Sequence, residues 1–151
     1  MINSTRFEND FRNIAQFGVL DNGGVTRLAL TKADHDARNY LIRKMQEAGL
    51  DVHIDNYGNI RGRRPGADNQ LPTVMMGSHL DTVPQGGHYD GIIGVLAALE
   101  VVRQLNDQQI KTNHPLEIIN FCCEESSRFG VATLGSKGLT GQLDSQQMKT
   151  I

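Results

Sequence analysis

Two short stretches of the chain carry the residues that could do chemistry. The segment GSHLDTVPQGGHYDGIIG, residues 77–94, sets two histidines and two aspartates among glycines, and its candidate site residues are His79, Asp81 and Asp90. The segment IINFCCEESSRFG, residues 118–130, contains the adjacent pair Glu124 and Glu125. Imidazole and carboxylate groups bind divalent metal ions, and a free carboxylate nearby can act as a general base toward water that such an ion acidifies. The two stretches together indicate a metal-dependent hydrolytic site.

Taken singly, each of these residues has an ordinary structural explanation. Asp90 directly precedes a helical pattern, and aspartate is among the preferred N-caps, so capping is the first expectation for it. A lone histidine near a strand end more often makes a structural hydrogen bond than it binds metal, and paired surface glutamates are common. In the spacing of His79 and Asp81, however, one ring nitrogen could bind metal while the aspartate accepts a hydrogen bond from the other.

Three helices are predicted from apolar residues at helical spacing. The first lies within residues 3–18, with Ser4 or Thr5 as its cap and a stripe of Phe7, Phe11 and Ile14. The second begins after Thr31, with Asp34 completing an acidic variant of the capping box, and ends at Gly49. Its stripe is Ala37, Leu41, Met45 and Ala48. The third follows residue 94, with a stripe of Val95, Leu96, Leu99, Val102 and Leu105.

Strands are predicted between the helices. Residues 50–55 alternate with period two, and NYGN turns the chain into IRGRR, which is typical of a hairpin. TVMMGSH, residues 73–79, and LEIINFCC, residues 116–123, are nearly all apolar, as expected for central strands buried on both faces. Residues 135–141 predict a short turn or half-helix. The alternation of strands and helices predicts an α/β layered sheet, in which ligands collect beyond the carboxyl ends of central strands, where His79 and Glu124 fall.

Composition narrows the class of protein. The net charge is −2, from 15 basic and 17 acidic residues without long runs, so neither nucleic acid nor an anionic membrane is an expected partner. No stretch approaches the roughly 18 apolar residues of a membrane span, and the polar N-terminus lacks the core of a signal peptide. A cytoplasmic location is therefore expected. Cys122 and Cys123 are neighbours whose side chains should point to opposite faces of a strand, so no disulfide is expected.

Together and in order, the motifs resemble a known enzyme family. GSHLDTVPQGGHYDGIIGVLAALEVV and INFCCEESSRFGVATLGSKGLTG are similar to the N-terminal part of the metal-dependent amidases that include N-carbamoyl-L-amino-acid hydrolases, beta-ureidopropionases and allantoate amidohydrolases, relatives of the di-zinc exopeptidases and aminoacylases. GGVTRLALT and AGLDVHIDNYGNIRGRR resemble the upstream segments of that family. The resemblance implies a helix–sheet–helix catalytic domain of the zinc-exopeptidase type. Residues 1–151 would form its N-terminal part, with the lid domain absent.

The resemblance also implies a role for each site residue. His79 would bind one divalent ion, Asp90 would bridge two ions, and Glu125 would bind the second. Glu124 would be the general base, and Asp81 the carboxylate that orients the metal-binding histidine. Zinc, manganese, cobalt and nickel suit such ligands alike. The implied reaction is hydrolysis of a C–N bond in a small ureido or amide substrate, such as an N-carbamoyl amino acid, by a homodimeric enzyme.

The chain departs from the family pattern in places. Ser126 stands where relatives usually have glycine, which would cost strain if that backbone needs a positive φ. His88 is expected to be a loop residue rather than a ligand, and no metal role is expected for the remaining histidines: His35, His53 and His114.

The length of the chain sets the remaining expectations. With the polar tail 142–151 at its end, the chain resembles an N-terminal fragment, in which each ion has two protein ligands where a catalytic zinc normally has three. Weak metal binding and little or no hydrolysis are expected from it alone. The alternatives are a fragment of a di-metal exopeptidase or aminoacylase, and a non-catalytic domain that self-associates through uncovered edges. A dinucleotide-binding fold is disfavoured because no G-x-G-x-x-G follows a strand.

Overall fold

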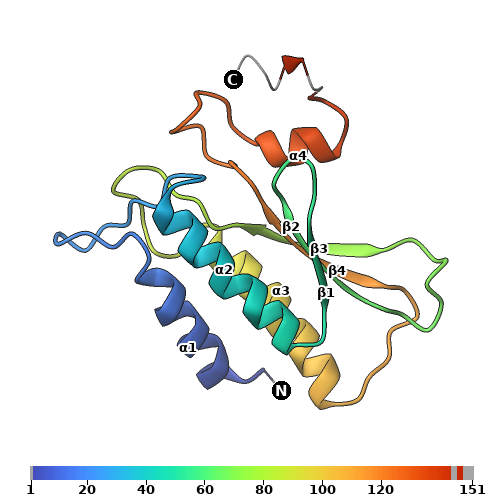
Figure 1. Ribbon diagram of the computed structural model, residues 1–151. Helices are drawn as coiled ribbons and strands as arrows, with labels where there is room; N and C mark the ends of the chain where they lie inside the picture. Colours follow the sequence, from blue (N-terminus) through green and yellow to red (C-terminus); the bar gives the residue numbers. More distant parts are fainter. Residues whose placement is uncertain (1, 144–145, 148–151) are drawn as a thin grey trace.

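The protein is a layered α/β structure, seen in a computed structural model that describes residues 2–143 and 146–147 (Figure 1). Its elements are α1 (Ser4–Ala15), α2 (Lys32–Glu47), β1 (Asp51–Ile54), β2 (Ile60–Arg64), β3 (Val74–His79), α3 (Ile92–Asp107), β4 (Leu116–Phe121) and α4 (Leu134–Leu139). The α/β class predicted from the sequence is confirmed, as are the hairpin and the short helix near residue 135. Most of the predicted polar tail lies outside the described residues.

The four strands form one mixed sheet in the order β1-β2-β4-β3. β1 and β2 pair antiparallel, β2 and β4 pair antiparallel, and β3 runs parallel to β4. In that parallel pair His79 lies opposite Phe121, so both strands end at the same edge of the sheet. The prediction that the two chemical segments emerge side by side is therefore confirmed.

β3 occupies a different place from the one predicted. We expected a central strand buried on both faces, yet within the described residues β3 is an edge strand, with Val74 50% and Met75 39% exposed. β4 takes the central position, and its residues 116–120 are all buried. An apolar run predicts a strand, but the neighbours that pair with that strand decide how much of it is buried.

α1, α2 and α3 lie on one face of the sheet, and α4 lies apart from them beyond the end of β4 (Figure 1). α2 packs against β1 and β2, α3 packs against β3 and β4, and α1 packs on α3. The predicted apolar stripes supply much of one core cluster, which includes Leu41, Met45, Ile60, Val95, Leu99 and Ile118. None of the helices in the described part of the chain combines the length and the apolar character of a membrane span.

The helix caps match the sequence in one case and differ in another. Thr31 caps α2 as predicted, although the Asp34 carboxylate accepts its hydrogen bond from the Leu30 amide rather than from Thr31. The cap of α1 is Asn3, whose side chain accepts from the Arg6 amide. The expectation of Ser4 or Thr5 was wrong because both residues already lie in the first helical turn.

A buried arginine fastens the chain just beyond β3. Arg27 is fully buried; its Nε donates to the Leu80 carbonyl at 2.7 Å and its Nη1 to the Phe17 carbonyl at 2.7 Å. Its backbone amide donates to the Thr82 hydroxyl at 2.9 Å, and its carbonyl accepts from the Thr82 amide at 3.0 Å. Burial lowers the pKa of Arg27. This clasp fixes residues 80–82, which lead out of the end of β3.

Removing this guanidinium is expected to destabilise the protein. Arg27→Met deletes the donors to three backbone carbonyls, those of Leu80, Phe17 and Ile14, so the free energy of unfolding should fall by about 2–4 kcal/mol. Urea unfolding followed by circular dichroism measures the change. Arg12→Met is the matched control: its partner Glu8 is solvent-exposed, so a change within about 0.5 kcal/mol is expected. Equal effects of the two substitutions would contradict a stabilising role for the hydrogen bonds of Arg27.

Candidate metal centre

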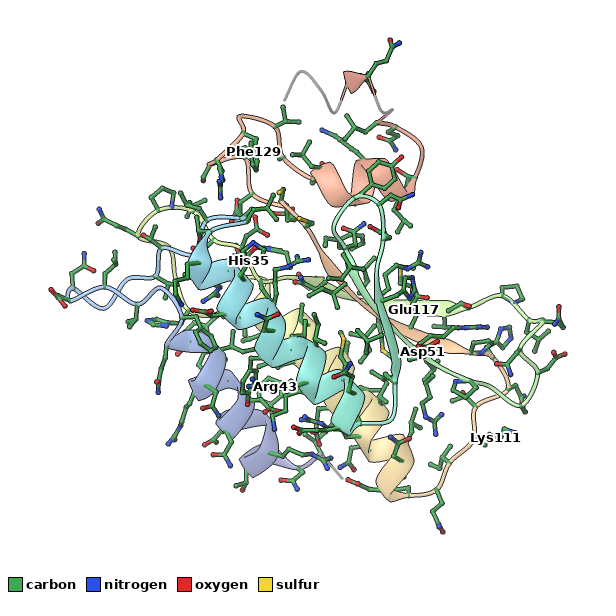
Figure 2. All side chains as sticks on the ribbon, viewed as in Figure 1. His35, Arg43, Asp51, Lys111, Glu117 and Phe129 are labelled. Carbon is green, nitrogen blue, oxygen red and sulfur yellow. The ribbon has the colours of Figure 1, made fainter. Side chains whose placement is uncertain are left out.

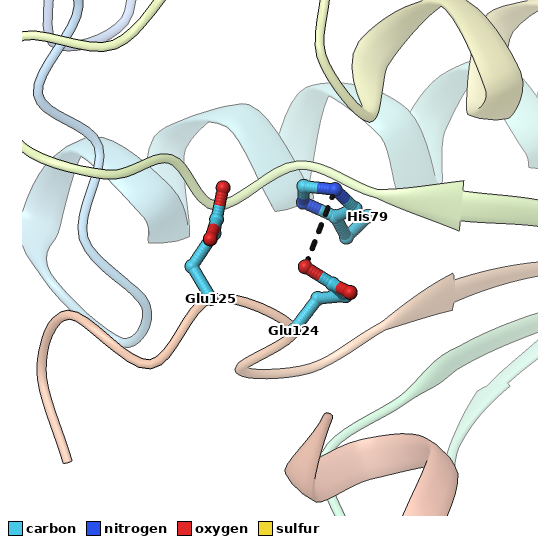
Figure 3. Close-up of side chains that lie close together, drawn as sticks. All are labelled: His79, Glu124 and Glu125. Atoms are coloured by element: carbon cyan, nitrogen blue, oxygen red, sulfur yellow. Dashed lines mark ion pairs between the residues drawn. The ribbon is translucent and has the colours of Figure 1, made fainter. Parts of the chain in front are cut away.

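Three side chains converge where β3 and β4 end (Figure 3). His79 is the last residue of β3. β4 ends at Phe121, and Glu124 and Glu125 follow in the next turn, directly after the two cysteines. Nε2 of His79 is 3.6 Å from Oε2 of Glu124. One ligand atom from each of the three residues lies within 4.8 Å of the others. His79 is buried while both glutamates are partly exposed, so the cluster has a polar wall and an open side.

The histidine is held in one orientation. Its Nδ1 lies 2.9 Å from the backbone carbonyl of Asp81. A carbonyl only accepts hydrogen bonds, so Nδ1 carries the proton, and the neutral ring has its free lone pair on Nε2, facing Glu124. The sequence predicted the Asp81 carboxylate as the partner; Oδ1 of that carboxylate is 3.6 Å from Nδ1, and the carbonyl makes the bond.

The Asp81 carboxylate accepts hydrogen bonds from the backbone rather than from the histidine ring. It is buried and accepts hydrogen bonds from the backbone amides of Glu124, at 3.3 Å, and of Glu125, at 3.0 Å. These bonds tie the end of β3 to the turn after β4. Asp81 therefore fixes both the histidine, through its carbonyl, and the two glutamates, through its side chain.

Asp90 is not the cap of α3, so the structural prediction for it was wrong. The N-cap is Gly91, at φ 70°, and no side chain caps the helix. The Asp90 side chain is 76% exposed, and its Oδ1 lies 3.9 Å from Nε2 of His79. Asp90 therefore adjoins the cluster on the histidine side, and its bridging role stays a prediction.

Backbone strain falls on a cysteine rather than on the serine that departs from the family pattern. Ser126 is not among the residues with positive φ, so the strain expected there does not arise. Cys123 adopts φ 53° instead. Both cysteines are free, as predicted, but their Sγ atoms are 3.6 Å apart. The expected opposite-facing geometry was wrong because Cys123 has left the extended conformation.

The other histidines lie outside the cluster. His88 is in a loop, where its Nε2 contacts the Gly23 carbonyl at 2.7 Å. Figure 2 labels His35 on α2. His53 lies on β1, and His114 contacts the Pro72 carbonyl from a loop.

Two supporting residues were missed in the sequence. Arg27 could have been recognised in the sequence, because it is a charged residue inside the mainly apolar run VTRLAL. No feature of the sequence marked Asn59, which is fully buried. Its Nδ2 donates to the Gly135 carbonyl and its Oδ1 accepts from the Cys122 amide, both at 2.9 Å. It ties the β1–β2 hairpin to the turn that carries the glutamates.

The electrostatics of the cluster favour a bound cation. Burial alone would lower the pKa of His79, but the carboxylate and carbonyl of Asp81 and the charge of Glu124 outweigh it and raise this pKa to about 9. Burial raises the pKa of Glu125; the His79 charge opposes that rise, and the nearby carboxylates add to it. Carboxylates crowded together in this way gain from a positive charge between them.

The His79 shift predicts a pH dependence of stability. Because the folded pKa is raised, protonated His79 stabilises the metal-free fold fully below about pH 6.5, and this contribution is lost as pH rises through about 9. The loss should reach about 3 kcal/mol at most. Urea unfolding with a chelator present, at several pH values, measures it. In His79→Gln the slope over this window should be smaller; an unchanged slope would assign it to other groups.

The chain matches known proteins along most of its length. Residues 75–150 match the model of peptidase family M20/M25/M40. The chain is 38% identical over 150 residues to an N-carbamoyl-L-amino-acid amidohydrolase from Pseudomonas sp. strain NS671, covering 99% of this chain and 36% of the relative. It is 40% identical to an allantoate amidohydrolase from Bacillus subtilis, covering 90% and 33%.

The fold is also similar to that of a solved amidase structure. A hydantoinase/carbamoylase family amidase from Burkholderia ambifaria superposes with a TM-score of 0.93 at 46% identity, over 96% of this chain and 36% of that one. The chain thus spans about a third of the length of the relatives it matches. The Pseudomonas and Bacillus relatives carry the name amidohydrolase, which denotes enzymes that hydrolyse C–N bonds. By the family model that covers half of its residues, the chain belongs to peptidase family M20/M25/M40.

Proposed function

We propose that the complete protein is a metal-dependent amidohydrolase that cleaves the C–N bond of an N-carbamoyl amino acid or a related ureido compound of the allantoate type. The observation that carries this proposal is the convergence of His79, Glu124 and Glu125 at the carboxyl ends of two parallel strands. The relatives that carry amidohydrolase names support the ureido or amide class of substrate.

The proposed metal ligands are His79, Asp90 and Glu125. The donor set fits a divalent cation: one imidazole with a free Nε2, and carboxylates on two sides of it. Zinc, manganese, cobalt and nickel all accept such ligands, and we propose two ions with Asp90 between them. When bound, the ions would polarise the substrate carbonyl and lower the pKa of water.

Glu124 is the proposed general base. Its carboxylate is partly exposed and within 3.6 Å of His79, so it can reach a water molecule at the open side of the cluster. It would accept a proton from the attacking water and deliver that proton to the leaving nitrogen. Asp81 would act as the positioning residue, because its carbonyl sets the tautomer of His79 and its side chain holds the backbone of Glu124.

We also propose that residues 1–151 are the N-terminal part of a di-metal catalytic domain. The match to about a third of each relative supports this. With two protein ligands per ion, the isolated chain would bind metal weakly and turn over little substrate. A cytoplasmic location and a homodimeric complete protein belong to the same proposal; the free thiols of the two cysteines fit a reducing compartment.

The experiment is a substrate comparison on the complete protein. N-carbamoyl-L-amino acids and allantoate, dipeptides, and N-acyl amino acids are offered separately, after a chelator and again after each divalent metal is restored. We expect metal-dependent release of ammonia from the ureido compounds. Preferred hydrolysis of dipeptides or acyl amino acids would move the protein to the exopeptidase or aminoacylase branch. A stable oligomer with no hydrolysis of any substrate would favour a non-catalytic, self-associating protein.

A further inference from the structure

The two cysteines form a paired thiol site beside the metal centre. They follow β4 directly, and their Sγ atoms lie 3.6 Å apart. Adjacent residues in an extended strand point to opposite faces, but Cys123 adopts φ 53°, which brings its side chain to the side of Cys122. These are the two cysteines of the 151-residue chain, so the pair has no competing thiol within it.

The backbone at this pair is fixed on several sides. The Cys122 amide donates to Oδ1 of the buried Asn59 at 2.9 Å. The carbonyls of Cys122 and Cys123 accept from the first turn of α4, from the amides of Gly135 at 2.9 Å and of Leu134 at 3.1 Å. The two sulfur atoms are therefore held near each other before any ligand arrives, so little ordering is needed when one binds.

A pocket gives access to the thiols. Both cysteines are 4–5% exposed, and both line a pocket of about 310 Å³. Its remaining wall is mainly apolar and aromatic and includes Leu30, Tyr57, Phe129 and Leu134. This volume lies at the small end of the range for ligand pockets. The site thus joins two sulfur donors to a space suited to one small aromatic or aliphatic group.

We propose that this pocket binds a thiophilic ligand whose central atom bonds to both sulfurs, the class of monosubstituted trivalent arsenicals, with the organic group in the apolar pocket. In the step, an aryl arsenic oxide loses its oxygen, two As–S bonds form, and the two thiol protons leave with that oxygen as one water molecule. Arsenic stays trivalent, so no oxidant or reductant is needed. The second bond forms within one complex, which makes the adduct far more stable than a single As–S bond. This site is separate from the proposed hydrolytic chemistry.

Phenylarsine oxide and intact-mass spectrometry test the proposal on the 151-residue chain. We expect one phenylarsenic group per chain, formed with loss of one water, that survives excess glutathione, a monothiol, and is released by dithiothreitol, a dithiol. Cys122→Ser and Cys123→Ser should each lose the adduct in glutathione, an apparent weakening of at least about 100-fold. Cys123→Ser combined with Ser4→Cys is the matched control, since it keeps two thiols but places one on α1, and it should behave like the single variants.

Specific outcomes would overturn the proposal. A glutathione-resistant adduct in either single variant would mean that one sulfur suffices. If the unmodified chain does not retain phenylarsine oxide, the proposal is also overturned. This holds whether or not both cysteines react with methyl methanethiolsulfonate, a reagent that needs only one thiol. Phe129→Ala tests the placement of the aryl group: affinity for phenylarsine oxide should fall by about tenfold while arsenite binding is unchanged. Equal effects on both arsenicals would exclude the pocket as the site of the ring.

Discussion

Replacing Glu124, the proposed general base, by glutamine is expected to lower kcat of the complete protein on the ureido substrate proposed above by about 100- to 10,000-fold, the usual contribution of a general base. Glutamine keeps the size of the side chain but cannot accept the proton of the attacking water. The backbone amide of residue 124 still donates to Asp81, so the turn should keep its shape. Metal content, measured on the same sample, should stay at the level of the unsubstituted protein.

Glu125→Gln is the matched control for this prediction. It makes the same chemical change one residue away, where the backbone amide donates to the same carboxylate. Here the expected result is weaker metal binding, with activity that recovers in part as metal is added. The three-residue cluster contains both glutamates, so the opposite pattern is a real alternative. Loss of metal in Glu124→Gln, with metal retained in Glu125→Gln, would exchange the two roles.

Gly91→Ala is expected to damage the candidate metal centre through the backbone that supports His79. Gly91 has φ 70°, and a Cβ there would lie 2.7 Å from Cε1 and 2.8 Å from Nδ1 of His79, and in collision with the His79 carbonyl. The left-handed conformation alone should cost an L-residue about 1–3 kcal/mol of stability. Since the ring cannot keep its position, metal affinity should fall by about 10- to 100-fold, as when a partner that orients a ligand is removed.

Gly87→Ala provides the comparison within the same loop. A Cβ at Gly87 meets no atom within 4 Å, and its φ is not in the left-handed region. Stability within about 0.5 kcal/mol of the unsubstituted chain and unchanged metal affinity are expected. Thermal unfolding and calorimetric titration with zinc or manganese measure both quantities. If Gly91→Ala binds metal as well as Gly87→Ala does, the packing of residue 91 on His79 does not support the site.

Much of the fold was predictable because local patterns carry it. The stripe from Ala37 to Ala48 with its cap Thr31, and the alternation that ends in NYGN, predicted α2 and the β1–β2 hairpin within a few residues. The convergence of His79 with the glutamates also followed, because two segments that end strands of one α/β sheet open toward the same edge.

The failures share a physical cause. Asp90 has the residue type of an N-cap, yet the cap is Gly91 with a positive φ, and the Asp90 carboxylate lies 3.9 Å from His79 instead. TVMMGSH has the composition of a central strand, yet pairing of β4 with both β2 and β3 leaves it at an edge within the described residues. A sequence pattern reports which residues favour an element, whereas the backbone path and the neighbours decide where a side chain points.

The sequence by itself determined the class of fold, the strand ends that carry the chemistry, and the residue types able to hold a cation. Only the tertiary structure decided that the Asp81 carbonyl sets the tautomer of His79 and that the Asp81 carboxylate holds the backbone of the two glutamates. It also decided that the sulfur atoms of Cys122 and Cys123 lie close together. Hydrophobic periodicity is a local pattern, so it can be read directly from the sequence. Hydrogen bonds across 40 or more residues, and single φ angles of positive sign, depend on how distant segments pack, which no short window of sequence records.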